Sequence, residues 1–172
     1  VIGDPSLCLL KHPIFKDLEI TSQDITLSNP NPAPGETVRI NATVHNVGEL
    51  SVDEIPVKLT DGQKGPQIGA TQIIDTIDAG EAKTVSVNWT VPTDGKSHDI
   101  YVEVDPLNDI PEENETNNIA YITTVLPDLR VDAVYVNYLS DSSNKMVINA
   151  TISNQGFAKA SNIPVAFYYS NS

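Results

Sequence analysis

The sequence predicts an all-β, immunoglobulin-like (fibronectin III-like) β-sandwich of about seven strands, followed by a truncated second copy. Three observations predict this fold class: apolar and polar residues alternate in short runs, turn signals separate the runs, and a segment of the chain repeats. β-Branched residues are abundant, and no apolar stripe with a 3.6-residue period reaches helix length. About seven strands in roughly 110 residues match the size of such a sandwich.

Period-two alternation predicts the strands in chain order. The inward positions of the clearest runs are Val38, Ile40, Ala42 and Val44, then Val85, Val87, Trp89 and Val91, and then Ile100, Val102 and Val104. Turn signals bound these runs at Pro34-Gly35, Val47-Gly48, Asp61-Gly62, Ala79-Gly80 and Asp94-Gly95. Because Trp89 falls on the inward side, we interpret it as a core anchor rather than as a platform for a ligand.

An internal repeat sets the predicted domain boundaries. Residues 40–48 (INATVHNVG) resemble residues 148–156 (INATISNQG) at an offset of 108 (148 − 40), and the sequence IPV recurs at the same offset. Upstream, Asp17-Leu18 resembles Asp128-Leu129 at an offset of 111 (128 − 17), which predicts three extra residues in the 29–34 loop of the first copy.

Three segments follow from this repeat. We predict a linker or preceding segment at residues 1–16, a complete module at residues 17–126, and the first part of a second module at residues 127–172. The predicted linker between the modules is only Leu126-Pro127, and its proline stiffens the joint. We take the chain as an excerpt of a longer polypeptide.

Composition excludes several classes of partner. The chain has 10 basic and 23 acidic residues, a net charge of −13, so it lacks the clustered positive charge that nucleic acid or anionic lipid requires. With one cysteine, Cys8, it forms no internal disulfide, so the fold depends on a hydrophobic core. No apolar stretch of about 18 residues exists, and we predict no membrane span in this segment.

Several motifs of the first copy occur together in one known family. They are Asp17-Leu18-Glu19-Ile20, Pro34-Gly35-Glu36, His45-Asn46-Val47-Gly48, Ala79-Gly80-Glu81, Val87-Asn88-Trp89-Thr90, and the stretch from Asp105-Pro106 to Asn117-Asn118. In these motifs the chain resembles the CARDB domain, the cell adhesion related domain found in bacteria and common in archaeal surface proteins. The resemblance implies an extracellular or cell-surface location, tandem modules, and adhesive or spacer roles. The implied partners are neighbouring domains of the same polypeptide and a cell-surface protein or polysaccharide.

The acidic loop, residues 105–118, is the candidate metal site. Ca²⁺ takes about 6–8 oxygen ligands, and the loop is rich in carboxylates and amides. The candidate ligands are Asp105, Asn108, Asp109, Glu112, Glu113 and Glu115. The alternative is a purely structural connection between the last two strands, with turns set by Pro106 and Pro111 and with side chains bonding nearby backbone groups. No EF-hand spacing is present.

Four Asn-x-Ser/Thr sequences are candidate glycosylation sites: Asn41, Asn88, Asn114 and Asn149. The alternation places Asn41, Asn88 and Asn149 away from the core and Asn114 in the acidic loop. Asn and Thr are common at outward strand positions, which is the alternative explanation of these sequences. Glycosylation also requires a host that attaches sugars to asparagine.

The sequence favours a non-catalytic structural or adhesive spacer module. Its histidines, His12, His45 and His98, lack metal-ligand spacing, and His45 and His98 are expected at strand ends, as surface or turn residues. No nucleophile elbow, P-loop or zinc-protease motif occurs. The alternative is a carbohydrate- or protein-binding accessory module of a secreted enzyme, stabilised by Ca²⁺. Sugar binding needs exposed aromatic side chains, for which Tyr101 and Tyr138 are the candidates.

Overall fold

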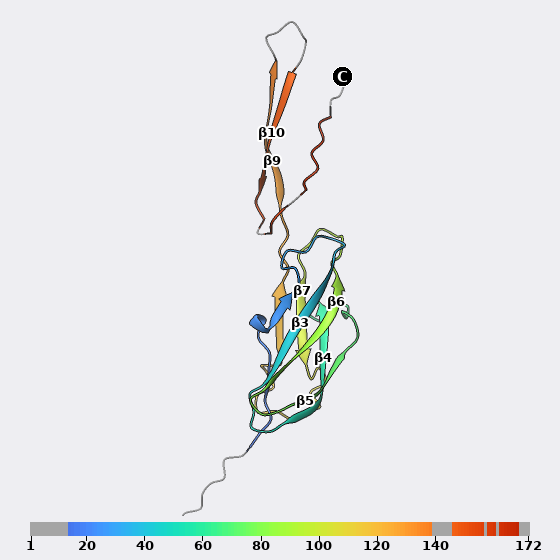
Figure 1. The fold of residues 1–172 in the computed structure, drawn as a ribbon, viewed down its shortest axis with the longest axis vertical. Helices are drawn as coiled ribbons and strands as arrows, with labels where there is room; N and C mark the ends of the chain where they lie inside the picture. The colour runs from blue at the N-terminus through green and yellow to red at the C-terminus, as the bar shows by residue number, and fades with distance from the viewer. Residues whose placement is uncertain (1–13, 139–145, 157, 161, 169–172) are drawn as a thin grey trace, which may run out of the picture.

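The computed structural model describes residues 14–138, 146–156, 158–160 and 162–168. Its first part is a sandwich of two antiparallel sheets (Figure 1). The eight strands of the sandwich are β1 (Leu18–Glu19), β2 (Ile25–Leu27), β3 (Thr37–Asn46), β4 (Val52–Asp61), β5 (Gln72–Ile77), β6 (Ala82–Thr90), β7 (Asp99–Val104) and β8 (Ile119–Thr123). The all-β sandwich predicted from the sequence is confirmed.

In the first sheet, β3 is central. Strands β1 and β2 pair with β3 and are separated by a short 3-10 helix, η1 (Ser22–Asp24), while β6 also pairs with β3. The second sheet has the order β5-β4-β7-β8. The two very short strands β1 and β2 account for the difference between the eight strands observed and the seven or so predicted.

The core lies between the two sheets and consists of the inward side chains that the alternation predicted. Ile40 and Val44 of β3 and Ile100 of β7 are fully buried, and Trp89 of β6 is 6% exposed. Complete burial of a Val or Ile side chain contributes about 1.5–3 kcal/mol to stability. The sandwich therefore has an extensive apolar core of its own, and Trp89 is part of it.

A β-hairpin follows the sandwich along the chain and is formed by β9 (Leu129–Tyr138) and β10 (Met146–Asn154). It extends beyond one end of the sandwich (Figure 1). Cross-strand partners such as Ile148 with Val136 and Ala150 with Val134 share one face of the hairpin. This face is apolar but open, because Val134 is 57% exposed and Ile148 is 40% exposed.

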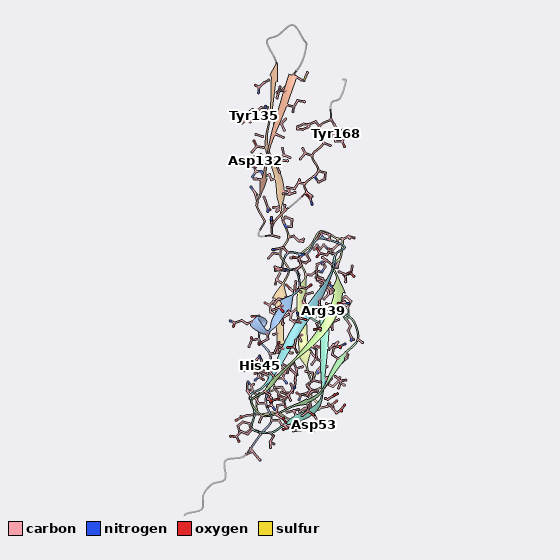
Figure 2. The ribbon with its side chains drawn as sticks, viewed as in Figure 1. Arg39, His45, Asp53, Asp132, Tyr135 and Tyr168 are labelled. Carbon is pink, nitrogen blue, oxygen red and sulfur yellow. The ribbon has the colours of Figure 1, made fainter. Side chains whose placement is uncertain are left out.

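The described residues beyond the hairpin add no further strand to the predicted first part of a second module. Residues 162–168 are irregular and exposed, and the side chain of Tyr168, labelled in Figure 2, is 93% exposed. A strand needs a hydrogen-bonded neighbour, and none is assigned to this segment within the described chain. Among all the residues that the structure describes, no helix has the length and apolar character needed to cross a membrane.

Candidate functional site

The acidic loop connects β7 to β8, as predicted, and lies at the end of the sandwich where the chain enters β1. Four hydrogen bonds join the loop to the entering chain. The Glu113 N–H donates to the Lys16 carbonyl (2.9 Å), and the Ile20 N–H donates to the Asn117 carbonyl (3.0 Å). The Asn117 amide donates to the Asp17 carboxylate (3.0 Å), and the Leu18 N–H donates to the Glu112 carboxylate. These hydrogen bonds fix the position of β1 at this end of the sandwich.

Within the loop, carboxylates accept hydrogen bonds from the loop's own backbone. Asp105 is 4% exposed and accepts N–H groups from Asp109 (3.2 Å) and Ile110 (2.7 Å). Glu115 accepts the N–H of Glu112 (2.8 Å). These bonds support the structural interpretation of the loop, because they use carboxylate oxygens that a cation would otherwise take.

A hollow of about 160 Å³ beside the loop collects part of the candidate metal set. Asp105, Asn108 and Glu115 line it, together with Asn118. Asn118 is 5% exposed, and its Oδ1 atom has no hydrogen-bond partner among the described residues. A buried amide oxygen without a partner is costly, so this oxygen is available to a ligand.

The carboxyl group of Glu112 lies next to this hollow, where its Oε1 accepts a hydrogen bond from the Asn118 amide (2.7 Å). Burial raises the pKa of Glu112 to about 7, and the charges of Glu115 and Asp105 act in the same direction, against the hydrogen bonds from Leu18 and Asn118. The Glu112 carboxyl group is therefore protonated more readily than an exposed one.

The structure does not gather the whole predicted metal set. Asp109 and Glu113 are exposed and do not line the hollow. Among the described residues, no group of three or more His, Cys, Asp or Glu side chains is arranged to hold a metal ion. A cation at the hollow would depend on amide oxygens, chiefly that of Asn118, as well as on Asp105 and Glu115.

At the opposite end of β7, His98 lies between two carboxylates, a contact that sequence reasoning missed. Its Nδ1 is 2.9 Å from the carboxylate of Asp61 and its Nε2 is 3.1 Å from Asp94. Both nitrogens can donate only when the ring is protonated. The side chain is 11% exposed, so it is largely buried rather than at the surface as expected. The ring also meets Trp89 edge-on, with 5.7 Å between the ring centroids.

Burial opposes protonation of His98, but its hydrogen bonds to Asp61 and Asp94 outweigh burial and raise its pKa. His45 also differs from a free surface histidine, since its Nε2 lies 2.8 Å from Asp24 (His45 is labelled in Figure 2). His12 lies outside the described residues. Spacing along the sequence gave no signal for the contacts of His98 with Asp61 and of His45 with Asp24, because these residues are 37 and 21 positions apart. Asp94, in contrast, is only four residues from His98.

The candidate sugar-binding tyrosine Tyr101 is stacked on Tyr121 of the neighbouring strand, with ring centroids 4.7 Å apart. Tyr121 is 49% exposed, so the pair forms a small aromatic surface on the outer face of the second sheet. The side chain of the other candidate, Tyr138, lies outside the described residues.

The four candidate glycosylation sites differ in their surroundings. Asn88 and Asn149 lie on exposed strand positions, and Asn41 is half-buried with its Oδ1 accepting a hydrogen bond from Ser86 (2.7 Å). Asn114 lies in the exposed acidic loop, where its Oδ1 accepts the Thr116 hydroxyl (2.7 Å). Asn114 is thus the candidate that lies outside a strand.

An Asn-x-Gly turn after β3 fixes the point where the chain enters the sandwich. Asn46 is 1% exposed and donates to the carbonyls of Leu50 (2.8 Å) and Ile77 (2.9 Å), while its Oδ1 accepts the Gly48 N–H (3.1 Å). The Val47 N–H donates to the Asp17 carbonyl (2.8 Å). A Cβ on Gly48 would lie 2.5 Å from the Asp17 nitrogen, so glycine is required there.

The same turn occurs after β10. Asn154 donates to the Ala158 carbonyl (2.7 Å), and its Oδ1 accepts the Gly156 N–H (3.1 Å). The Gln155 N–H donates to the Asp128 carbonyl (2.7 Å), and a Cβ on Gly156 would lie 2.4 Å from the Asp128 nitrogen. These residues are the sequence equivalents of the turn after β3 at the predicted offsets. We call this arrangement the entry latch.

Comparison with known proteins gives a consistent picture of the fold. The CARDB family model matches residues 15–121. The CARDB domain of the PF1109 protein of Pyrococcus furiosus, solved in complex with di-metal ions, is 23% identical with a TM-score of 0.56, covering 66% of this chain and 94% of that one. A domain of a Methanosarcina acetivorans protein assigned to the cell surface is 24% identical with a TM-score of 0.51, covering 62% and 89%. No curated protein matches the sequence.

Proposed function

Because the chain belongs to the CARDB family, we propose that it is a non-catalytic structural or adhesive spacer segment of a secreted or cell-surface protein. The observation that carries this proposal is the recurrence of the entry latch directly after a closed sandwich. A chain that begins the same strand pair again builds modules in series, which separates the domains at its two ends. In this proposal, residues 127–172 are the first part of a second module.

A surface-display experiment tests the spacer proposal. The chain is placed between a cell-wall anchor and an epitope, and antibody access to the epitope is measured. Replacing residues 17–126 by an unrelated sandwich of equal length is expected to preserve access, because the spacer role depends on the length of the module. Loss of access or of cell attachment after this exchange would instead indicate that the module binds a partner through its own surface.

We also propose that Ca²⁺ stabilises the acidic loop. The unpaired Oδ1 of Asn118, the crowding of Glu112, Glu115 and Asp105, and the metal ions in the Pyrococcus domain support this proposal. Glu115→Gln is expected to weaken binding more than Glu113→Gln, since Glu115 lines the hollow and Glu113 does not. Calorimetric titration with CaCl₂ checks this, and no heat at millimolar Ca²⁺ would remove the proposal.

The carbohydrate-binding alternative depends on the stacked pair of Tyr101 and Tyr121. An exposed aromatic surface suits the apolar face of a sugar ring, although the two rings already cover part of each other. A glycan array probed with wild-type protein and with Tyr121→Ala distinguishes the two functions. Binding that disappears in the variant supports a sugar-binding module, and no binding by the wild type supports the spacer.

A further inference from the structure

We infer that the junction between the sandwich and the next module is a specific interface, in which the entry latch of one module is held against the exit end of the module before it. This inference rests on the spacer proposal and specifies how successive modules contact each other. It assigns a partner to the exit end of the sandwich: the latch end of another module of the same architecture, as the described residues around Asp128, Asn154 and Ala158 present it. Four observations lead to it.

First, the sandwich holds the departing chain up to Thr124. The Thr124 N–H donates to the His98 carbonyl (2.8 Å), and the Thr124 hydroxyl accepts the His98 N–H (2.9 Å). Thr124 is 3% exposed. The chain is therefore fixed to the first module immediately after β8.

Second, the latch of the hairpin holds the chain from Leu126 onward. The Leu126 carbonyl accepts the Ala158 N–H (3.4 Å), and the Asp128 N–H donates to the Asn154 side chain (3.0 Å). Gly156 lies against the backbone of residues 126–128, where a Cβ would come within 2.4 Å of the Leu126 oxygen. One residue, Val125, separates the chain held by the sandwich from the chain held by the latch.

Third, a loop of the sandwich reaches the latch. The 29–34 loop and the region around Ala158 line a common hollow of about 370 Å³. Pro32, in the middle of this loop, is buried, and Ala158 on the other side is 3% exposed. A proline in a connecting loop is normally exposed, so its burial indicates that the loop is packed at the junction.

Fourth, hydrogen bonds within the sandwich fix the 29–34 loop. The Glu36 carboxylate accepts the Asn29 amide (2.9 Å) and the Ala33 N–H (2.8 Å), and the Gly35 N–H donates to the Val91 carbonyl (2.8 Å). This is also the loop in which the first copy has its three extra residues. The extra length has a physical use at this place, because it extends the loop toward the next module.

Distances between two spin labels test the inference on the whole chain. Labels are attached at Asp75→Cys on β5 and Thr151→Cys on β10, both exposed positions, in a Cys8→Ser background. We expect a narrow distance distribution for the native junction. A reference with Gly-Ser-Gly-Ser inserted between Val125 and Leu126 should be about twofold broader, because such linkers behave as random coils. A native distribution as broad as this reference would overturn the inference.

Three variants, two in the latch and one in the loop, separate the parts of the interface. Gly156→Val should broaden the distribution toward the reference, whereas the neighbouring Gln155→Val, whose side chain is exposed, should leave it narrow. Asn154→Ala serves as a second latch variant if Gly156→Val loses the hairpin by circular dichroism. Deleting residues 31–33 should broaden the distribution while Trp89 fluorescence stays native. A narrow distribution in all three variants would show that the latch and loop do not hold the junction. A broad distance distribution would overturn this inference but would leave the antibody access measured in the spacer experiment unchanged. The two proposals can therefore fail separately.

Discussion

His98 and Glu112 lie at opposite ends of β7, and each binds its proton more tightly in the folded protein than in the unfolded chain. Such groups make the folded state more stable at low pH, and the gain is lost as the pH rises through the folded pKa. Asp24 acts in the opposite sense. Although burial raises its pKa, hydrogen bonds from Thr21 and His45 outweigh burial and lower it, so its contribution is lost on acidification.

For Glu112, the window is set by the ordinary pKa of 4.5 and the folded value of about 7. Stability should fall as the pH rises from 4.5 to 7, by about 1 kcal/mol after allowance for solvent screening. Glu112→Gln should remove this decline, because the amide carries no charge, and its oxygen can still accept one of the two hydrogen bonds from Leu18 and Asn118. Urea unfolding followed by Trp89 fluorescence at pH 5 and pH 8 measures the difference. Glu113→Gln is the control, and an equal flattening in that variant would contradict the assignment.

For His98, the stabilisation is fully present below the ordinary pKa of 6.5 and is lost above its raised folded pKa. His98→Gln should therefore cost about 1 kcal/mol at pH 6 and less at pH 9, because the ion pairs with Asp61 and Asp94 need the protonated ring. The same unfolding measurement applies, with the more exposed His45→Gln for comparison. A loss for His98→Gln that is independent of pH would indicate that only its packing on Trp89 matters.

At the scale of elements, the local sequence pattern was sufficient to predict the strands and turns but not the contacts between them. Alternation identified β3, β6 and β7, because every second side chain in these strands is buried between the sheets. It did not reveal the interruption of the first strand by η1, which the Asp24 carboxylate stabilises by accepting the Thr21 N–H (2.8 Å). The position of the acidic loop was predicted correctly. The hydrogen bond from the Leu18 N–H to the Glu112 carboxylate was not, because the two residues are 94 positions apart in sequence.

The glycine of the Asn-x-Gly turn after β3 lies directly against the backbone of residues 15–17. Gly48→Ala should destabilise the sandwich by about 2–4 kcal/mol, since the added Cβ meets the backbone of Asp17 and the neighbouring strand β1 has to move. Gly80→Ala is the matched control. Gly80 has a φ of +77° but open space around its Cβ position, so it should cost only about 1 kcal/mol. Thermal unfolding compares them, and equal losses would show that the close approach is not what requires Gly48.

At the scale of the whole molecule, burial divides the chain unequally. The core cluster extends from Leu18 to Ala120, and none of its members comes from β9 or β10. The hairpin instead presents Val131, Val134 and Val136 with 47–60% of each side chain exposed. The repeat predicted an incomplete second module after residue 126. Sequence reasoning did not predict the hollow shared by the 29–34 loop and Ala158, because contacts at the junction leave no periodic signal in the sequence.

Limited proteolysis should reveal this difference between the two parts. Residues 14–126 contain both sheets and the complete core, so they should resist cleavage, whereas a lone two-stranded hairpin is marginal in water and should be trimmed first. We expect mass spectrometry to show a stable fragment that ends near Pro127. Its unfolding midpoint should match that of the whole chain, because the hairpin adds little to the core around Trp89. Equal resistance of both parts to cleavage would mean that the open face of β9 and β10 is covered in solution. Analytical ultracentrifugation would then determine whether a second copy of the chain covers this face.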